Sequence, residues 1–450
     1  MNKTTLIKNA KLINEGEIFQ ADLLIEGEYI KTIDRSQSLT DADQIIDASG
    51  KYLIPGMIDD QVHFRDPGLT HKGDLYTESR AAVAGGITSF MEMPNTVPRA
   101  LTQDLLADKY KIGAEKSFAN YSFYMGTAND NLAEVLKTDP ATVCGIKIFL
   151  GASTGNMLVD KTEVIEEVLK YSAKTGLICT VHSEDEQTII DNAAKYKAKY
   201  GDEIDIKYHP EIRSREACYK CTKNIIGLAK KHKANLHVLH ISTKEELELF
   251  EAGEIDSKNI TAEACVHHLS FCDEDYATKG NKIKWNPAIK TSEDRAAIRA
   301  AVNQGRIDII ATDHAPHTIE EKTNSNYFKS AAGGPLVQHA LPALFELFHQ
   351  GVFSLETIVQ KTSHNIAKRF KVDKRGYIRE GYYADLTLVD LDSPWTVDAS
   401  NILYKCGWSP FEGDSFKSAI THTIVNGLIV YEHGEFIAKP NSMRLAFLRN

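Results

Sequence analysis

Five short segments of this sequence carry side chains that bind metal ions in proteins, and each lies in or just after an apolar run. His63 follows the run in PGMIDDQVHF, His182 ends LICTVH, and His240 lies in HVLHIST. Lys147 lies inside GIKIFL, and Asp313 follows IDIIAT. Imidazole nitrogens and carboxylate oxygens are the usual protein ligands of zinc. Because parallel strands bring their C-terminal ends to one rim of a barrel, these side chains predict a single metal site.

Lys147 gains a special chemistry if it is buried. Burial disfavours the ammonium form of a lysine, so the side chain tends to lose its proton. A neutral amine reacts with carbon dioxide to give a carbamate, whose two oxygens can bridge two metal ions. For a lysine taken alone, the alternative is a side chain that reaches solvent or pairs with a buried acid. The position of Lys147 beside the other four candidates favours the carbamate.

Gln61 stands where a second histidine would complete a chelating pair. Side chains at 61 and 63 point the same way in a strand, because successive residues alternate between its faces. Glutamine offers only a neutral amide oxygen, which is a poor zinc ligand beside imidazole. We therefore expect Gln61 to be a weak or absent ligand, and one or two zinc ions per chain.

Eight apolar runs predict strands, and most are followed by segments of helical periodicity such as TEVIEEVLKYSAK. Continuous apolar runs are typical of parallel strands buried on both faces. Eight such units predict a (β/α)8 TIM barrel over residues 54–375. A doubly wound sheet is the alternative, but no GxGxxG motif follows any run. The runs are 53–59, 87–93, 121–127, 144–150, 177–183, 236–242, 260–266 and 307–313.

Both ends of the sequence differ from the middle in their pattern of apolar and polar residues. Residues 1–53 alternate apolar and polar side chains between turn signals, and the pattern returns in GYYADLTLVDLD and AITHTIVNGLIVYEHGEF. Such alternation is typical of short antiparallel strands. We expect residues 1–53 and 376–450 to form one small β-sandwich domain together.

Composition excludes several classes of protein. The net charge of −10 argues against a nucleic-acid partner, because phosphate contacts need clustered Lys and Arg. No apolar run is long enough to span a membrane, and the N-terminus lacks the apolar core of a signal peptide. The seven cysteines are scattered, and Cys218 and Cys221 are expected to lie one turn apart in a helix. We expect a cytoplasmic enzyme with a small-molecule substrate.

The sequence resembles the dihydroorotases of the amidohydrolase superfamily, which are class I-like cyclic amidohydrolases, and the resemblance runs nearly from end to end. It is carried by PGMIDDQVHFRDPG, AAVAGGITSFMEMPNTVP, GIKIFLGAS, VHSED, HVLHIST, KWNPAIK, ATDHAPH and THTIVNGLIVYEHGEF. The resemblance implies a barrel with a small β domain from both termini. It implies that the zinc ligands are His63, carbamylated Lys147, His182, His240 and Asp313.

Four further residues match substrate-binding positions of the family. Arg65 and Asn95 correspond to the groups that bind the substrate carboxylate, and His317 lies beside them. Asn286 corresponds to an asparagine that contacts the pyrimidine ring. The sequence departs from the family at Gln61, where the family has histidine, and at Lys290, where many relatives carry arginine.

The implied reaction is reversible hydrolysis of L-dihydroorotate to N-carbamoyl-L-aspartate, a step of pyrimidine biosynthesis. Zinc can lower the pKa of bound water to about 7 and polarise the ring carbonyl. Asp313 is placed to accept the proton of the water and later donate one to the leaving nitrogen. Arg65 offers a fork-shaped partner for a carboxylate, although a salt bridge with Asp66 or Asp60 is the alternative.

Two other functions remain open. An allantoinase or hydantoinase has the same chemistry on another cyclic amide, but allantoinases tend to carry MPLN where this sequence has MPNT. A non-catalytic dihydroorotase-like partner of aspartate transcarbamoylase would explain Gln61, although the five candidate ligands are all present. We expect a homo-oligomer, with a dimer as one form.

Overall fold

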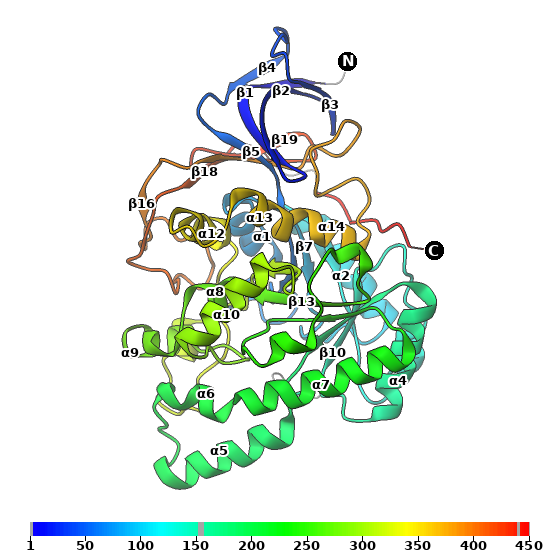
Figure 1. Cartoon of the computed structure of the whole chain (residues 1–450), viewed down its shortest axis with the longest axis vertical. Coiled ribbons are helices and arrows are strands. Elements are labelled where there is room, and N and C mark those ends of the chain that lie inside the picture. The colour runs from blue at the N-terminus through cyan, green and yellow to red at the C-terminus, as the bar shows by residue number, and fades with distance from the viewer. Residues whose placement is uncertain (1–2, 152–156, 439–441, 450) are drawn as a thin grey trace.

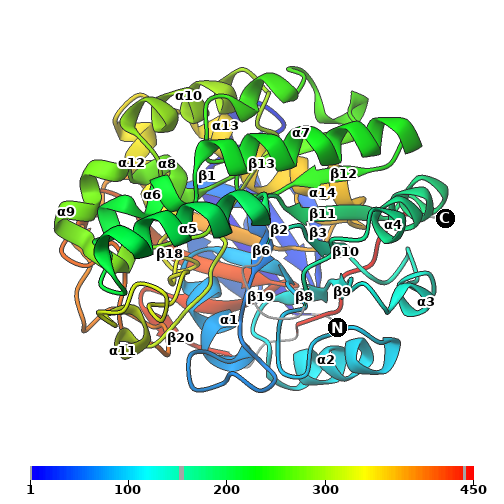
Figure 2. The same cartoon turned by 90° about the horizontal axis from the view of Figure 1, so that it is seen from below.

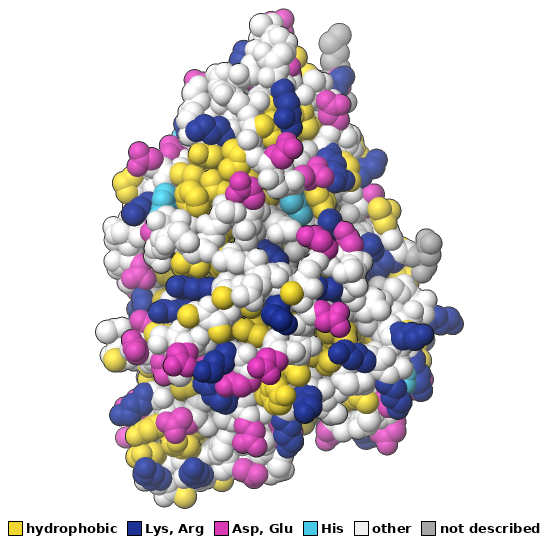
Figure 3. Space-filling model, in the orientation of Figure 1, with side chains coloured by type: hydrophobic (Ala, Val, Ile, Leu, Met, Phe, Trp, Pro, Cys, Tyr) yellow, Lys and Arg dark blue, Asp and Glu magenta, His cyan; other side chains and the backbone are white. Residues whose placement is uncertain are grey.

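The computed structural model describes residues 3–151, 157–438 and 442–449 of the chain. Strands from both chain ends form the upper part of the molecule in Figure 1, and the barrel with its helices lies below. On the face in Figure 3, Lys and Arg side chains are interspersed with Asp and Glu. Among the described residues, no helix combines the length and apolar character needed to cross a membrane.

Parallel strands in the middle of the chain form a closed barrel. Hydrogen bonds join β6 to β8 in one sheet and β9 to β14 in another. Only Tyr124 separates β8 from β9, and a parallel bridge between Val62 and His314 links the first strand position to the last. These junctions close eight strand positions into the predicted TIM barrel. The strands are β6 (Met57–Val62), β7 (Ile87–Glu92), β8 (Asn120–Phe123), β9 (Met125–Gly126), β10 (Gly145–Phe149), β11 (Ile178–His182), β12 (Leu236–Val238), β13 (Ile260–Cys265) and β14 (Ile309–Ala311).

Helices cover the outside of the barrel. Every residue of β6, β7, β10 and β11 is buried, as expected for strands packed on both faces. Cys218 and Cys221 both lie in α7 as free thiols, which agrees with the prediction. The helices are α1 (Leu75–Ala84), α2 (Gln103–Lys116), α3 (Leu132–Val135), α4 (Thr162–Thr175), α5 (Glu186–Tyr200), α6 (His209–Ile212), α7 (Arg215–His232), α8 (Val266–Ser270), α9 (Tyr276–Lys279), α10 (Ser292–Asn303), α11 (Ile319–Lys322), α12 (Ala340–His349), α13 (Leu355–Val359) and α14 (Asn365–Phe370).

A nine-stranded sheet combines strands from both chain ends. Its order is β20-β19-β18-β15-β5-β1-β2-β3, and β4 pairs with β1. The sheet has its own apolar core, to which strands from both ends contribute side chains. The strands are β1 (Thr4–Asn14), β2 (Glu17–Glu26), β3 (Tyr29–Asp34), β4 (Gln44–Asp47), β5 (Tyr52–Pro55), β15 (Leu386–Asp390), β18 (Ala419–Val425), β19 (Leu428–Glu432) and β20 (Glu435–Phe436), and β16 (Trp395–Thr396) pairs separately with β17 (Ser415–Phe416).

The first predicted barrel strand, 53–59, was wrong in its bounds. The apolar run is divided at Gly56, so that β5 belongs to the nine-stranded sheet and β6 to the barrel. A Cβ at Gly56 would lie 2.2 Å from Cγ2 of Thr88, so the backbone passes too close for a larger residue. The run looks continuous in sequence because both halves are buried.

Helix α5 lies outside the main core, and none of its residues is buried. Figure 2 shows α5 and α6 in front of the barrel strands. Ile189 and Ala193 of α5 line the cavity at the strand ends. This helix therefore forms one wall of the candidate site.

Candidate active site and metal centre

A cavity of about 390 Å³ lies at the C-terminal ends of the barrel strands. All ten side chains that the sequence indicated for metal binding, catalysis or substrate binding line it. Their positions agree with the expected convergence of strand ends, and their individual roles stay proposals. The ten are Gln61, His63, Arg65, Asn95, Lys147, His182, His240, Asn286, Asp313 and His317.

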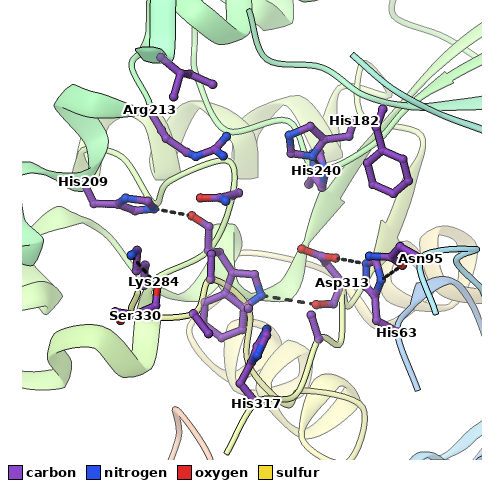
Figure 4. Close-up of a pocket in the computed structure, with 18 of the residues that line it drawn as sticks. His63, Asn95, His182, His209, Arg213, His240, Lys284, Asp313, His317 and Ser330 are labelled. Carbon is purple, nitrogen blue, oxygen red and sulfur yellow. Dashed lines mark hydrogen bonds and ion pairs between the residues drawn. The ribbon is translucent and has the colours of Figure 1, made fainter. Parts of the chain in front are cut away.

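His182 and His240 present ring nitrogens to each other inside the cavity. His182 ends β11, and its Nδ1 lies 3.0 Å from Nε2 of His240 (Figure 4). The Nε2–H of His182 donates to Glu184 Oε2 at 2.9 Å, so its Nδ1 keeps a lone pair toward the cavity. Burial lowers the pKa of His182 and holds that of His240 well below its usual range. Both rings are therefore neutral at pH 7, which is the form that binds metal.

His63 directly follows β6, and Asn95 fixes its tautomer. The Nδ1–H of His63 donates to Asn95 Oδ1 at 2.7 Å, so Nε2 carries the lone pair. That lone pair faces Asp313 Oδ1 at 3.2 Å (Figure 4). Burial lowers the pKa of His63, which disfavours a proton between the two acceptors. A nitrogen and a carboxylate oxygen in this arrangement fit a metal cation between them.

Gln61 turns its amide nitrogen toward the same carboxylate. Its Nε2 donates to Asp313 Oδ1 at 3.1 Å. Its Oε1, the only oxygen that could bind a metal, lies 3.6 Å from Sγ of Cys265, whose single proton has a closer acceptor in Glu263 Oε1 at 3.2 Å. The amide therefore holds Asp313 by a hydrogen bond and points its oxygen at a thiol.

Lys147 is buried within β10, with 1% of its surface exposed. Its Nζ lies 4.7 Å from the centroid of the Phe149 ring. Burial lowers the pKa of Lys147 to about 7, although the charges of Asp313 and Glu263 oppose the shift. A substantial share of the side chain is then a neutral amine at pH 7, the form that the predicted carbamate requires.

The local backbone holds several of these side chains in an uncommon conformation. Arg65, His240 and Asp313 have φ values of 69°, 40° and 49°, in the left-handed region that non-glycine residues rarely adopt. Such strain persists where the surrounding structure enforces it, commonly at functional sites. Each of the three residues follows a barrel strand and turns its side chain into the cavity.

The side chains at the strand ends form a donor set that suits zinc. The donors are two converging imidazoles, a third imidazole that faces a carboxylate, and a lysine amine of lowered pKa. All are buried, and the free lone pairs of His63 and His182 are fixed by hydrogen bonds on the far side of each ring. Nitrogen and oxygen donors of this kind suit zinc and similar divalent ions, so the residues fit.

Arg65 brings a positive charge to one side of the cavity, and His317 lies beside it. The guanidinium Nη2 of Arg65 donates to Nε2 of His317 at 3.1 Å, and its Nε donates to the carbonyl of Pro316. Nδ1 of His317 in turn donates to Glu321, which also pairs with Lys72 at 3.1 Å. Asn286 borders the same cavity, and its Oδ1 has no hydrogen-bond partner among the described residues.

Another part of the cavity lining consists of residues that the sequence did not indicate. Arg213 contacts Glu184 at 2.5 Å and so extends the hydrogen-bond chain that begins at His182. Lys284 donates to the carbonyls of Tyr327 and Ser330 at 2.6 and 2.7 Å and pins the loop that carries them. Figure 4 shows Arg213, Lys284 and Ser330 on the side away from His63. The three residues come from irregular segments, and for Arg213 and Lys284 only the basic character was visible in the sequence.

Two further clusters that the sequence did not predict bring three metal-binding groups within 4.8 Å of one another in the described part of the chain. One is Asp60, His237 and Glu263, buried inside the barrel. Burial opposes the protonation of His237, but the carboxylates of Asp60 and Glu263, 3.3 and 3.6 Å from its Nε2, raise its pKa to about 9. A proton therefore satisfies this cluster. The other is His422, Glu432 and His433 in the nine-stranded sheet.

The sequence of the chain matches a known protein family. Residues 52–430 match the Amidohydrolase family. The chain is 31% identical over 433 residues to a dihydroorotase of Methanosphaera stadtmanae, with 96% of this chain and 97% of that relative covered. It is 32% identical to a dihydroorotase of Fusobacterium nucleatum, with 95% and 98% covered.

A solved structure agrees with the fold over the whole length. The L-hydantoinase (dihydropyrimidinase) from Arthrobacter aurescens has a TM-score of 0.93 and 28% identity, with 98% of each chain covered. The fold of the barrel and of the sheet from both termini is therefore shared with that hydrolase. This chain belongs to the amidohydrolase family.

Proposed function

We propose that this chain is a dihydroorotase, which interconverts L-dihydroorotate and N-carbamoyl-L-aspartate in pyrimidine biosynthesis. The observation that carries the proposal is the buried Arg65–His317 pair in the same cavity as the candidate metal ligands. Dihydroorotate carries a carboxylate, and a guanidinium fork matches a carboxylate in shape and charge. The two relatives named dihydroorotase support this substrate.

We assign zinc as the metal, with one or two ions per chain. A zinc ion bound there would act as a Lewis acid toward the ring carbonyl and lower the pKa of water. Gln61 is assigned as a weak or absent ligand, because its amide oxygen faces Cys265. The proposed ligands are His63, Lys147 as its carbamate, His182, His240 and Asp313.

The other steps, proton transfer and substrate binding, are assigned to individual side chains. Asp313 accepts a proton from the water that adds to the ring carbonyl, and delivers a proton to the ring nitrogen as the carbon–nitrogen bond breaks. The amide of Gln61 keeps this carboxylate in place. Arg65 binds the substrate carboxylate, and Asn286 contacts the ring. Asn95 serves the carboxylate together with His317, and it also orients His63.

A hydantoinase is the second candidate, favoured by one specific observation. The structural similarity to the L-hydantoinase extends over the whole chain, and Ile189, Ala193 and Phe328 form an apolar part of the cavity wall. An apolar ring substituent could lie against this wall, whereas dihydroorotate needs the Arg65 side. Allantoin, the substrate of an allantoinase, is the third cyclic amide to test as a substrate.

The deciding experiment compares substrates on the purified chain. We expect zinc to co-purify and dihydroorotate to be hydrolysed with a higher kcat/KM than hydantoins or allantoin. A preference for a 5-substituted hydantoin would replace the proposal with the hydantoinase. Bound metal without turnover of any cyclic amide would favour a non-catalytic partner of aspartate transcarbamoylase.

Assembly, location and domain division are separate proposals. We propose a homo-oligomer, with a dimer as the first form to test by analytical ultracentrifugation, and a cytoplasmic location. Association with aspartate transcarbamoylase is tested by co-sedimentation of the two proteins.

We divide the chain into residues 1–53 plus 376–450 and residues 54–375, with β5 crossing the first boundary. Limited proteolysis tests that division.

A further inference from the structure

A histidine-rich cluster lies in the sheet from both termini, where the proposed reaction does not use it. His422 of β18 pairs across the sheet with Glu432 of β19, and His433 follows in the turn before β20. Both histidines belong to the motif THTIVNGLIVYEHGEF. Their ring nitrogens and the carboxylate of Glu432 all lie within 4.8 Å of one another.

The hydrogen bonds around His422 leave a position for a cation. The hydroxyl of Thr421 donates its only proton to the carbonyl of Leu388 at 3.1 Å. Nδ1 of His422 therefore donates to Thr421 Oγ1, which lies 3.1 Å away. The lone pair of Nε2 then faces Glu432 Oε1 at 3.2 Å. Two acceptors at that distance need a proton or a metal ion between them.

His433 offers a third donor from the solvent side. It is exposed, whereas the side chain of His422 is only 6% exposed and that of Glu432 is 37% exposed. His433 and Gly434 form the two-residue turn between β19 and β20, with φ values of 47° and 94°. The backbone N–H of His433 donates to the carbonyl of Thr421 at 2.8 Å, which fixes the turn beside His422. An ion can thus enter from solvent and meet a partly ordered set of donors.

We propose that His422, Glu432 and His433 form a second metal site, distinct from the catalytic cavity, that binds zinc or a similar divalent transition ion. Two imidazoles and one carboxylate are a common zinc ligand set, and water takes the fourth position. Nickel and copper are also expected to bind, following the usual order of divalent affinities. The bound ion would join β18, β19 and the turn before β20, and would stabilise this edge of the sheet.

The test counts zinc on the full chain and on matched variants. His433→Asn removes the exposed ligand, and asparagine tolerates the positive φ of the turn. Glu432→Gln removes the carboxylate. The control is His232→Asn at the end of α7, where an imidazole lies 3.6 Å from Glu166 Oε1 and no third ligand stands nearby among the described residues. Circular dichroism checks that each variant is folded.

After equilibrium dialysis at buffered micromolar zinc, we expect the wild-type chain and His232→Asn to hold one more ion than His433→Asn and Glu432→Gln. Zinc should also raise the midpoint of thermal unfolding of the wild-type chain and His232→Asn more than that of His433→Asn and Glu432→Gln. Equal zinc content in all four proteins would overturn the proposal and leave a proton between His422 and Glu432. Both results are independent of turnover, so they do not depend on the proposed reaction.

Discussion

Replacing Gln61 tests how this chain compensates for the missing histidine. Gln61→Leu removes the N–H that donates to Asp313 Oδ1 at 3.1 Å and keeps a side chain of similar size. A hydrogen bond to a charged group contributes about 1.5–3 kcal/mol. If Asp313 acts as the base, misplacing it should lower kcat by roughly 10–150-fold, since 1.4 kcal/mol corresponds to a factor of ten.

The same residue controls the expected number of metal ions. The oxygen of Gln61 faces Cys265 and its nitrogen faces Asp313, so the amide contributes no ligand in this orientation. The ion nearest His63 should therefore be held more weakly than the ion at Lys147, His182 and His240. We expect fewer than two zinc ions per chain after mild chelation. Gln61→His should restore the chelating pair on one strand face and increase this number.

The assay combines metal analysis after dialysis against a weak chelator with steady-state kinetics on dihydroorotate. Cys265→Ser is the matched control, because serine keeps a polar group near the oxygen of Gln61, whereas Cys265→Ala leaves an apolar one. Only the alanine variant should free the amide to rotate. If the unmodified chain keeps two zinc ions and Gln61→His leaves that number unchanged, position 61 is irrelevant to the metal and the reasoning is wrong.

Four further predictions concern the cavity. Asp313→Asn should lower turnover by roughly 10²–10⁴-fold at saturating substrate, and near-normal turnover would remove its assignment as general base. Arg65→Lys keeps the charge but loses the fork, so hydrolysis of dihydroorotate should fall much more than that of a hydantoin without a carboxylate, and equal losses would indicate a structural role. In crystals grown with zinc and bicarbonate, electron density should show a carbamate on Lys147, whereas a free ammonium would contradict the assignment. Glu184→Gln weakens the orientation of His182 and should lower zinc affinity about 10–100-fold in competition with a chelator, whereas unchanged affinity would exclude that role.

The barrel and the candidate ligands were predictable because each depends on a local pattern. Buried parallel strands read as apolar runs, and a polar side chain at the end of such a run must face the rim. His182 and Asp313 were found in this way. The division at Gly56 was not predictable, because it arises from the close approach of Thr88, which lies on another strand.

The rest of the site depends on contacts between distant segments. Arg213 and Lys284 lie in irregular segments, and nothing in their local sequence shows that they face the cavity. The oxygen of Gln61 lies against Cys265 at the end of β13, a residue distant in sequence and two barrel strands away from β6. Glu184 was visible in the motif VHSED, but only the structure shows that it accepts a hydrogen bond from His182.

The sheet that combines both chain ends has a consequence for synthesis of the protein. Leu53 of β5 pairs with Leu388 of β15, so this part of the sheet cannot form until almost the whole barrel has left the ribosome. Pairings between residues so distant in sequence form slowly, because the intervening chain must first be ordered. Until then the apolar faces of β1, β2 and β5 remain uncovered during translation, and the nascent chain is open to association with chaperones or with other copies.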